Sequence, residues 1–237
     1  MTSKESKEAT IKYIDKFMID NGFKLMKNSS SEAIYKRKTI LGYDIFGSSS
    51  AHYGPIQVFG FGVSKFIKPI EDITKEINKH IQLSPPITKN TRSLALTNHK
   101  LDADKQTKRV HRPETTEEDA KEYVEEVIEH LENVDLPLLY RFNDLREIDK
   151  VINGDNFWRD DWQREFGLGG NFTEKQFIIA KLVGGQKHLD EVIEKHRAAS
   201  IKYWAEKDEV VNCPYLTNIE TSIGFTIKYL KNVEAIY

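Results

Sequence analysis

Apolar residues recur at helical spacing at the start of the chain and then alternate with polar residues. Ile11, Ile14 and Met18 follow a three-then-four spacing, which predicts a helix from Glu5 to Asp20. Gly22 can adopt the left-handed conformation that ends such a helix. Short alternating runs separated by Gly, Ser and Pro follow. They predict strands over residues 23–26, 33–39, 41–46 and 57–64, with a longer turn or strand end over 48–55.

Helical spacing returns further along the chain. It predicts a helix from about Pro69 to His80, and a further strand is predicted over residues 91–97. The polar stretch 98–114 is expected to be a loop or a flexible hairpin. After it, Thr115 or Thr116 begins a capping pattern, and an apolar stripe continues to Leu131. A short buried turn is expected over 136–140, and helices over 143–154, 174–183 and 189–206. The segment 216–230 fits either a helix or a strand, and we favour the helix.

This order of elements predicts an α+β fold, with an antiparallel meander sheet packed by helices and a mostly helical C-terminal half. The polar stretch 98–114 separates residues 1–98, which form the helix-plus-sheet region, from residues 115–237, which form the helical region. We expect the helical region to dock on the first region as one compact unit.

Composition indicates a globular protein and narrows its partners. Hydrophobic residues make up 39% and charged residues 30% of the chain, too apolar a balance for a wholly disordered one. The 35 basic residues are mixed along the chain with 37 acidic ones, which disfavours nucleic acid as a partner and leaves room only for local basic patches. We find no apolar run of the ~20 residues that cross a membrane. The N-terminus has no apolar leader and Cys213 is the single cysteine, so we expect a cytoplasmic protein.

The sequence contains no specific catalytic or cofactor motif. Cys213 has no sequence-adjacent base that would activate it as a nucleophile. His188, Glu191 and His196 lack a metal-binding motif and are expected on a solvated helix face. We therefore expect no catalytic residue, no metal and no cofactor, and we favour a protein that is not an enzyme.

One candidate binding segment is rich in tryptophan. Trp158, Trp162 and Phe166 are spaced four apart and would form one stripe on a helix, with Arg159 beside it. Trp and Arg dominate binding hot spots, so Trp158, Arg159 and Trp162 are candidate anchors for a partner. The alternative is that the stripe packs on the protein's own core.

Two further groups are candidate binding surfaces. Polar aromatic and basic side chains could gather near the sheet and orient a small ligand or a peptide carboxylate, although ordinary surface tyrosines are the simpler interpretation. These residues are Tyr35, Arg37, Tyr43, His52 and Tyr53. The second group is an acidic helix face, which either solvates the helix or docks a basic partner. It comprises Glu118, Glu122, Glu125, Glu126, Glu129 and Glu132.

Three short stretches resemble small bacterial families of unknown function. They are residues 21–23 (Asn-Gly-Phe), 34–37 (Ile-Tyr-Lys-Arg) and 136–139 (Leu-Pro-Leu-Leu). Such families are often cytosolic and non-enzymatic, and some are similar to immunity proteins that neutralise toxins. The resemblance implies this kind of function and identifies no functional residue.

The first hypothesis is therefore a non-catalytic protein-binding module, similar to immunity proteins, whose partner is another protein. The alternative is a hydrolase or a small-ligand sensor with a site of no known motif between the sheet and the helices. The oligomeric state is left open.

Overall fold

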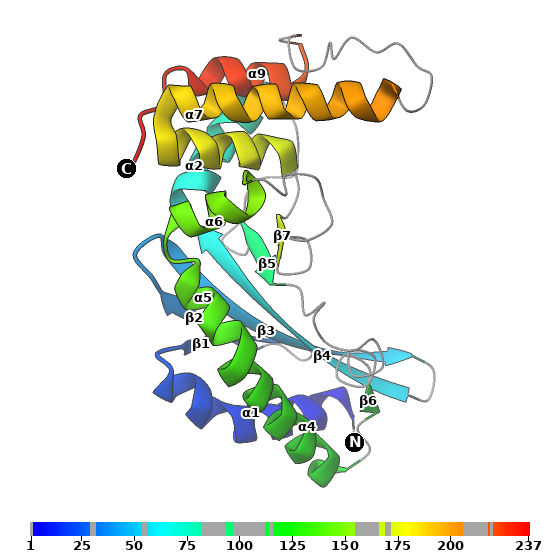
Figure 1. Cartoon of the computed structure of the whole chain (residues 1–237). Coiled ribbons are helices and arrows are strands. Elements are labelled where there is room, and N and C mark those ends of the chain that lie inside the picture. The colour runs from blue at the N-terminus through cyan, green and yellow to red at the C-terminus, as the bar shows by residue number, and fades with distance from the viewer. Residues whose placement is uncertain are drawn as a thin grey trace. The chain divides into compact units, whose positions relative to one another are not determined.

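The protein has an α+β fold (Figure 1). The computed structural model describes residues 2–28, 32–53, 56–81, 93–96, 112–113, 116–154, 166–168, 172–205, 218 and 220–237. The chain divides into two compact units, each built from several segments. Unit 1 comprises residues 1–67, 94–143 and 164–167, and unit 2 comprises residues 68–93, 144–163 and 168–237.

The sheet of unit 1 confirms the expected antiparallel meander. Its first four strands pair in chain order, and β5 (Leu94–Leu96) pairs with the fourth. The four are β1 (Lys24–Asn28), β2 (Glu32–Lys38), β3 (Gly42–Tyr53) and β4 (Ile56–Ile67). The short β6 (Arg112–Pro113) also pairs with β4, and β7 (Phe166–Leu168) follows β5 in the strand order.

Strand β3 is longer than the strand predicted over residues 41–46. It continues through its serine-rich second half to Tyr53, which lies opposite Ile56 of β4. Serine has little intrinsic preference for strands, but β4 supplies a complete backbone partner along this stretch. Pairing therefore overrides the local preference.

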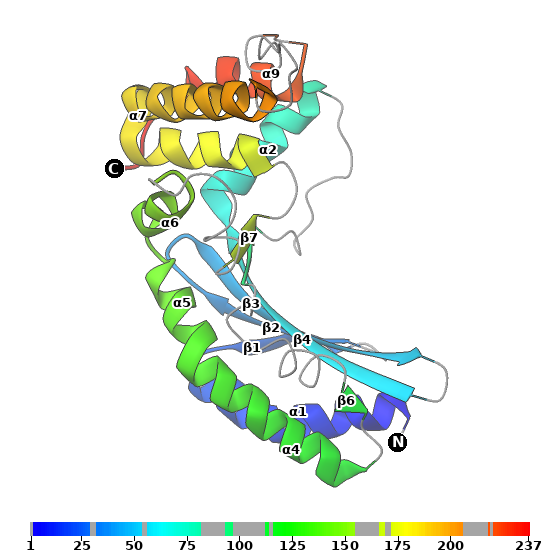
Figure 2. The same cartoon turned by 45° about the vertical axis from the view of Figure 1, so that its right-hand side comes forward.

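Helices cover one face of this sheet (Figure 2). Helix α1 (Ser3–Asp20) packs against α4 (Glu117–His130), and both begin with a capping box, formed by Thr2 with Glu5 and by Thr116 with Asp119. The sequence left Thr115 and Thr116 as alternative caps for α4, and the structure has Thr116 in that position. Alternating residues of the sheet, such as Tyr35 and Phe46, are buried on the covered face, where their rings meet edge to face at 6.1 Å.

The prediction of a turn over residues 136–140 is wrong, because these residues are helical. Helix α4 continues into a π-helical turn, η1 (Leu131–Asp135), and then into α5 (Leu136–Arg141). Pro137 lies in the first turn of α5, where a missing backbone N–H is tolerated, so it does not end the helix.

Unit 2 is helical. It contains α2 (Lys68–Ile81), α6 (Leu145–Ile152), α7 (Phe172–Ala205) and α9 (Ser222–Leu230), so the final segment is a helix as favoured. Helix α7 is interrupted at Gly185, whose φ of 67° and ψ of −155° suit only glycine. The break predicted between the helices over 174–183 and 189–206 therefore lies at this glycine. None of the described helices is long and apolar enough to span a membrane.

A histidine lies in the core of unit 2. His196 of α7 is 2% exposed, and its ring meets that of Phe177 edge to face at 4.9 Å. Burial disfavours the charged imidazolium and lowers the pKa of His196 to about 4. The histidine is therefore neutral in the folded protein at neutral pH, rather than solvated as the sequence suggested.

This burial predicts a loss of stability in acid. Between pH 6.5 and about 4 the unfolded chain binds a proton at His196 that the folded chain does not, so the free energy of unfolding falls as the pH falls. From pH 7 to pH 5 this group should lower it by about 2 kcal/mol. Urea unfolding at both pH values measures the loss, and His196→Leu should reduce the pH slope. A His196 ring resonance that titrates near pH 6.5 in an NMR experiment would contradict the expectation.

Candidate functional site

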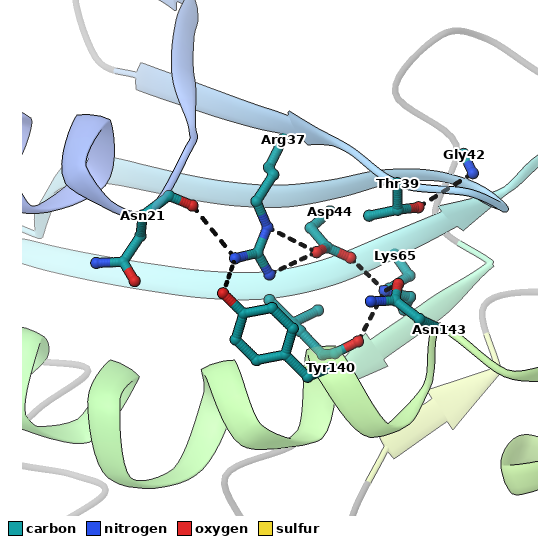
Figure 3. A network of polar contacts seen from close by, with 9 residues as sticks. Asn21, Arg37, Thr39, Gly42, Asp44, Lys65, Tyr140 and Asn143 are labelled. Carbon is teal, nitrogen blue, oxygen red and sulfur yellow. Dashed lines mark hydrogen bonds and ion pairs between the residues drawn. The ribbon is translucent and has the colours of Figure 1, made fainter.

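Three charged residues form a row across the sheet of unit 1 (Figure 3). Arg37 of β2 lies opposite Asp44 of β3, and Asp44 lies opposite Lys65 of β4. All three point to the covered face of the sheet and are buried, with Asp44 and Lys65 fully inaccessible. We call this row the charged cluster. It carries two positive charges and one negative charge in the core.

Asp44 joins the two cations. Its Oδ2 accepts hydrogen bonds from Arg37 Nε at 3.0 Å and Nη2 at 2.7 Å, and its Oδ1 accepts one from Lys65 Nζ. Charge-assisted bonds of this kind are about twice as strong as neutral ones. One carboxylate thus offsets part of the cost of burying both cations.

Lys65 attaches the sheet to α5 and the residues that follow it. Its ammonium group also donates to Leu139 O at 3.0 Å and to Asn143 Oδ1 at 2.8 Å, so all three of its donors are used. Burial lowers the pKa of Lys65 below its ordinary value, while the charge of Asp44 acts in the opposite direction.

Arg37 attaches the sheet to α1 and α5. Its guanidinium carbon lies 4.7 Å from the ring centre of Phe23 and 4.5 Å from that of Tyr140. Its Nη1 donates to Asn21 O at 3.2 Å and to Tyr140 Oη at 2.8 Å. Rings on both sides hold the planar group in one orientation. Only Tyr140, at 56% exposed, brings this cluster to the surface.

The geometry of the charged cluster suits support rather than reaction. A lysine acts as a nucleophile through a free lone pair, and Lys65 is buried with its three protons donated. Arg37 likewise directs its donors to protein acceptors rather than to a ligand. The cluster therefore holds α1, α5 and three strands together.

The other predicted site residues are not gathered around the charged cluster in the described structure. Tyr35 is buried, donates to Asp15 Oδ1 at 3.0 Å, and has its pKa raised, first by burial and then by that carboxylate. His52 and Tyr53 lie at the end of β3, and their side chains lie outside the described residues. The tryptophan segment with Trp158, Arg159 and Trp162 also lies outside them.

Sequence reasoning missed Asp44 and Lys65. The alternation of the strands could have revealed them. Asp44 in β3 and Lys65 in β4 occupy inward-facing positions, as Arg37 does in β2. A charged residue at an inward strand position requires a charged partner, and the register supplies it.

Unit 2 contains a second buried ionic group. Glu71 of α2 accepts a hydrogen bond from Ser93 Oγ at 2.7 Å, and Lys175 Nζ of α7 lies 3.0 Å from the same carboxylate oxygen. All three side chains are at most 3% exposed. The group joins α2 to α7 and the residue before β5.

Unit 2 also contains an Asp–His pair. His188 Nε2 lies 2.8 Å from Asp149 Oδ2, and Asn153 Nδ2 donates to the other oxygen of Asp149 at 2.8 Å. His188 Nδ1 lies 3.6 Å from Glu191. Both ring nitrogens face carboxylates, and we find no group of three metal-ligating side chains in the described part of the chain. His196 lies apart from this pair in the core, beside Phe177.

Comparisons with known proteins do not place the chain in a family. No family model, no curated protein and no solved structure matches it.

Removing the central carboxylate should destabilise the protein strongly. Asp44→Asn leaves Arg37 and Lys65 buried without a counter-charge, which should lower the free energy of unfolding by about 3–5 kcal/mol. Urea unfolding followed by circular dichroism measures the loss.

The matched control is Asp72→Asn, which removes an exposed aspartate from its ion pair with Lys68. An exposed pair contributes at most about 1 kcal/mol, so this variant should unfold almost as the wild type does. Equal losses in the two variants would show that the charged cluster does not hold unit 1 together.

Proposed function

We propose that this chain is a non-catalytic protein-binding module of the cytoplasm, similar in role to immunity proteins, and that its partner is a basic protein. The surface that takes the partner is the exposed side of α4. The observation that carries the proposal is a row of glutamates along this helix and into the π-helical turn η1, which we call the glutamate row. Its members are Glu118, Glu122, Glu125, Glu129 and Glu132, and all are exposed.

The spacing of the glutamate row places its side chains on one line. Steps of four, three, four and three residues follow one face of a helix. The opposite face carries the buried stripe that packs in unit 1, including Tyr123, Val124 and Val127. The helix therefore separates its charge from its core contacts.

Helices α1, α2 and α6 pair surface charges within one helical turn. Ion pairs three or four residues apart join Lys16 to Asp20 in α1, Lys68 to Asp72 in α2, and Lys150 to Glu147 in α6. Between Glu117 and Glu132, the sequence has eight acidic residues and one lysine, and Lys121 pairs with Glu118 at 3.3 Å. A helix surface that needed only solvation would not require this imbalance.

Charge repulsion makes the glutamate row unfavourable in the free protein. Like charges four residues apart, such as Glu125 and Glu129, destabilise a helix by a few tenths of a kcal/mol per pair. A basic partner would relieve this repulsion, and electrostatic attraction would speed its association.

A groove extends the acidic surface onto α1. It has a volume of about 450 Å³ and is lined by Glu5, Glu8, Ala9, Lys12 and Glu117. Lys12 is held by Glu117 at 2.6 Å, so the lining keeps a negative balance. The groove gives a partner a concave surface beside the glutamate row.

The internal clusters also support a binding role over a catalytic one. The ionisable groups around Asp44, Glu71 and Asp149 are engaged with protein partners. Catalytic groups instead need access to a substrate. The exposed carboxylates are the charged groups most available to another molecule.

Reversing charge on the glutamate row should abolish capture of the partner. Glu125→Lys with Glu129→Lys replaces attraction by repulsion, and the affinity of the purified partner should fall about tenfold or more, corresponding to roughly 1.4 kcal/mol. The full chain is immobilised, bound proteins are identified by mass spectrometry at low and high salt, and the affinity of each is then measured by calorimetry.

The matched control makes the same change in net charge elsewhere. Glu220→Lys with Glu234→Lys alters two exposed glutamates of unit 2 and should leave capture intact. A basic protein that is retained by the control, lost from the row variant and released by salt supports the proposal. If every captured protein binds both variants equally, or none is captured, the proposal is wrong.

A further inference from the structure

The face of the unit 1 sheet opposite the charged cluster carries a different set of residues. Neighbouring residues of a strand point to opposite faces, so the residues that flank Arg37, Asp44 and Lys65 point away from the covered face. We call this second face the lysine face. Its in-register positions are Lys24, Lys36, Lys38, Tyr43, Ile45, Gly47, Gly62, Ser64 and Phe66.

Lysines gather on β1 and β2. Lys24 lies directly opposite Lys36 in the β1–β2 pair, and Lys38 follows Lys36 on the same face of β2. Lys24 and Lys38 are exposed, and Glu32 is the one acidic residue at a lysine-face position among the described residues of β1–β5. This arrangement favours an anionic partner.

An aromatic pair continues the row that begins at Lys38. Lys38 lies opposite Tyr43, and Tyr43 lies opposite Phe66, so a cation and two rings cross three strands in register. The ring centres of Tyr43 and Phe66 are 6.3 Å apart, and Tyr43 is 43% exposed. An exposed ring supported by a second ring offers a flat surface for stacking.

Two glycines leave open space on the lysine face. Gly47 and Gly62 lie opposite each other on β3 and β4, and a Cβ atom added to either would meet no atom within 4 Å. Glycine inside a strand often marks a place where a ligand approaches the backbone closely. Ile45 and Ser64, between the glycines and the aromatic pair, are buried. These two buried residues separate two open places on the lysine face. One planar group could lie against the strand backbone at the glycines, and a second one against Tyr43.

We propose that the lysine face binds single-stranded nucleic acid, with phosphates at the exposed Lys24 and Lys38 and a base stacked on Tyr43. An acidic protein segment would use the lysines but would not need an exposed ring or the open space at the two glycines. Cationic strands combined with stacking rings are the features that single-stranded nucleic acid requires. The net charge of −2 disfavours this partner for the chain as a whole, but the strands concentrate lysines locally. The proposal is independent of the glutamate row.

Fluorescence anisotropy with labelled oligouridine and oligothymidine of about 12 nucleotides tests the lysine face. The full chain should bind with a dissociation constant in the micromolar range, and two phosphate contacts should give a slope of log K against log salt of about −1.4. Lys24→Gln with Lys38→Gln should weaken binding about tenfold and bring the slope close to zero. Tyr43→Ala should also weaken binding about tenfold, whereas Tyr43→Phe, which keeps the ring, should bind as the wild type does.

The control for charge is Lys228→Gln with Lys231→Gln, which removes two exposed lysines of unit 2 and should leave oligonucleotide binding unchanged. All substitutions are at exposed positions, and circular dichroism checks the fold. The proposal is overturned if no oligonucleotide binds at about 50 mM salt, or if the Lys24/Lys38 and Tyr43→Ala variants bind as the wild type does. It is also overturned if these lysines are required only for an acidic protein partner. None of these outcomes bears on the variants of the glutamate row.

Discussion

The attraction between Asp44 and its two cations is the interaction on which unit 1 depends. Arg37 and Lys65 could not stay charged in this core without a carboxylate between them. Their remaining donors reach Asn21, Leu139, Tyr140 and Asn143, so the same attraction fixes where α1 ends and where α5 lies against the sheet. A hydrophobic core sets no such direction, because apolar contacts tolerate sliding. The charged cluster therefore fixes the orientation of α1 and α5 on the sheet as well as holding them against it.

The charged side chains on the two faces of the sheet make different kinds of contact. The covered face uses its charges internally, and the α4 helix that packs on that side turns its carboxylates outward. The lysine face turns its cations outward from the same strands. The sheet and the helix layer on its covered face thus separate the acidic surface from the lysines. A net charge near zero hides this separation.

Sequence patterns predicted much of the fold of unit 1. The alternation in residues 23–64 and the stripe from Ala120 to Leu131 are strong signals, because burial on one face requires them. The extent of β3 and the helical state of residues 136–141 were not predictable in the same way. The first depends on pairing with β4, and the second on a π-helical turn that keeps the chain helical through Pro137. The sequence marks Arg37 as a candidate site residue. Its partners Asp44 and Lys65 can be identified only from the strand register.

The interleaving of the two compact units has a consequence for how the molecule can be made. The chain leaves unit 1 after Ile67, returns at Leu94 and leaves again after Asn143. Helix α2 therefore emerges during synthesis long before α7 and α9, the helices it packs against. No single cut releases either unit whole, and a truncated chain would expose the buried face of α2 to chaperones and proteases.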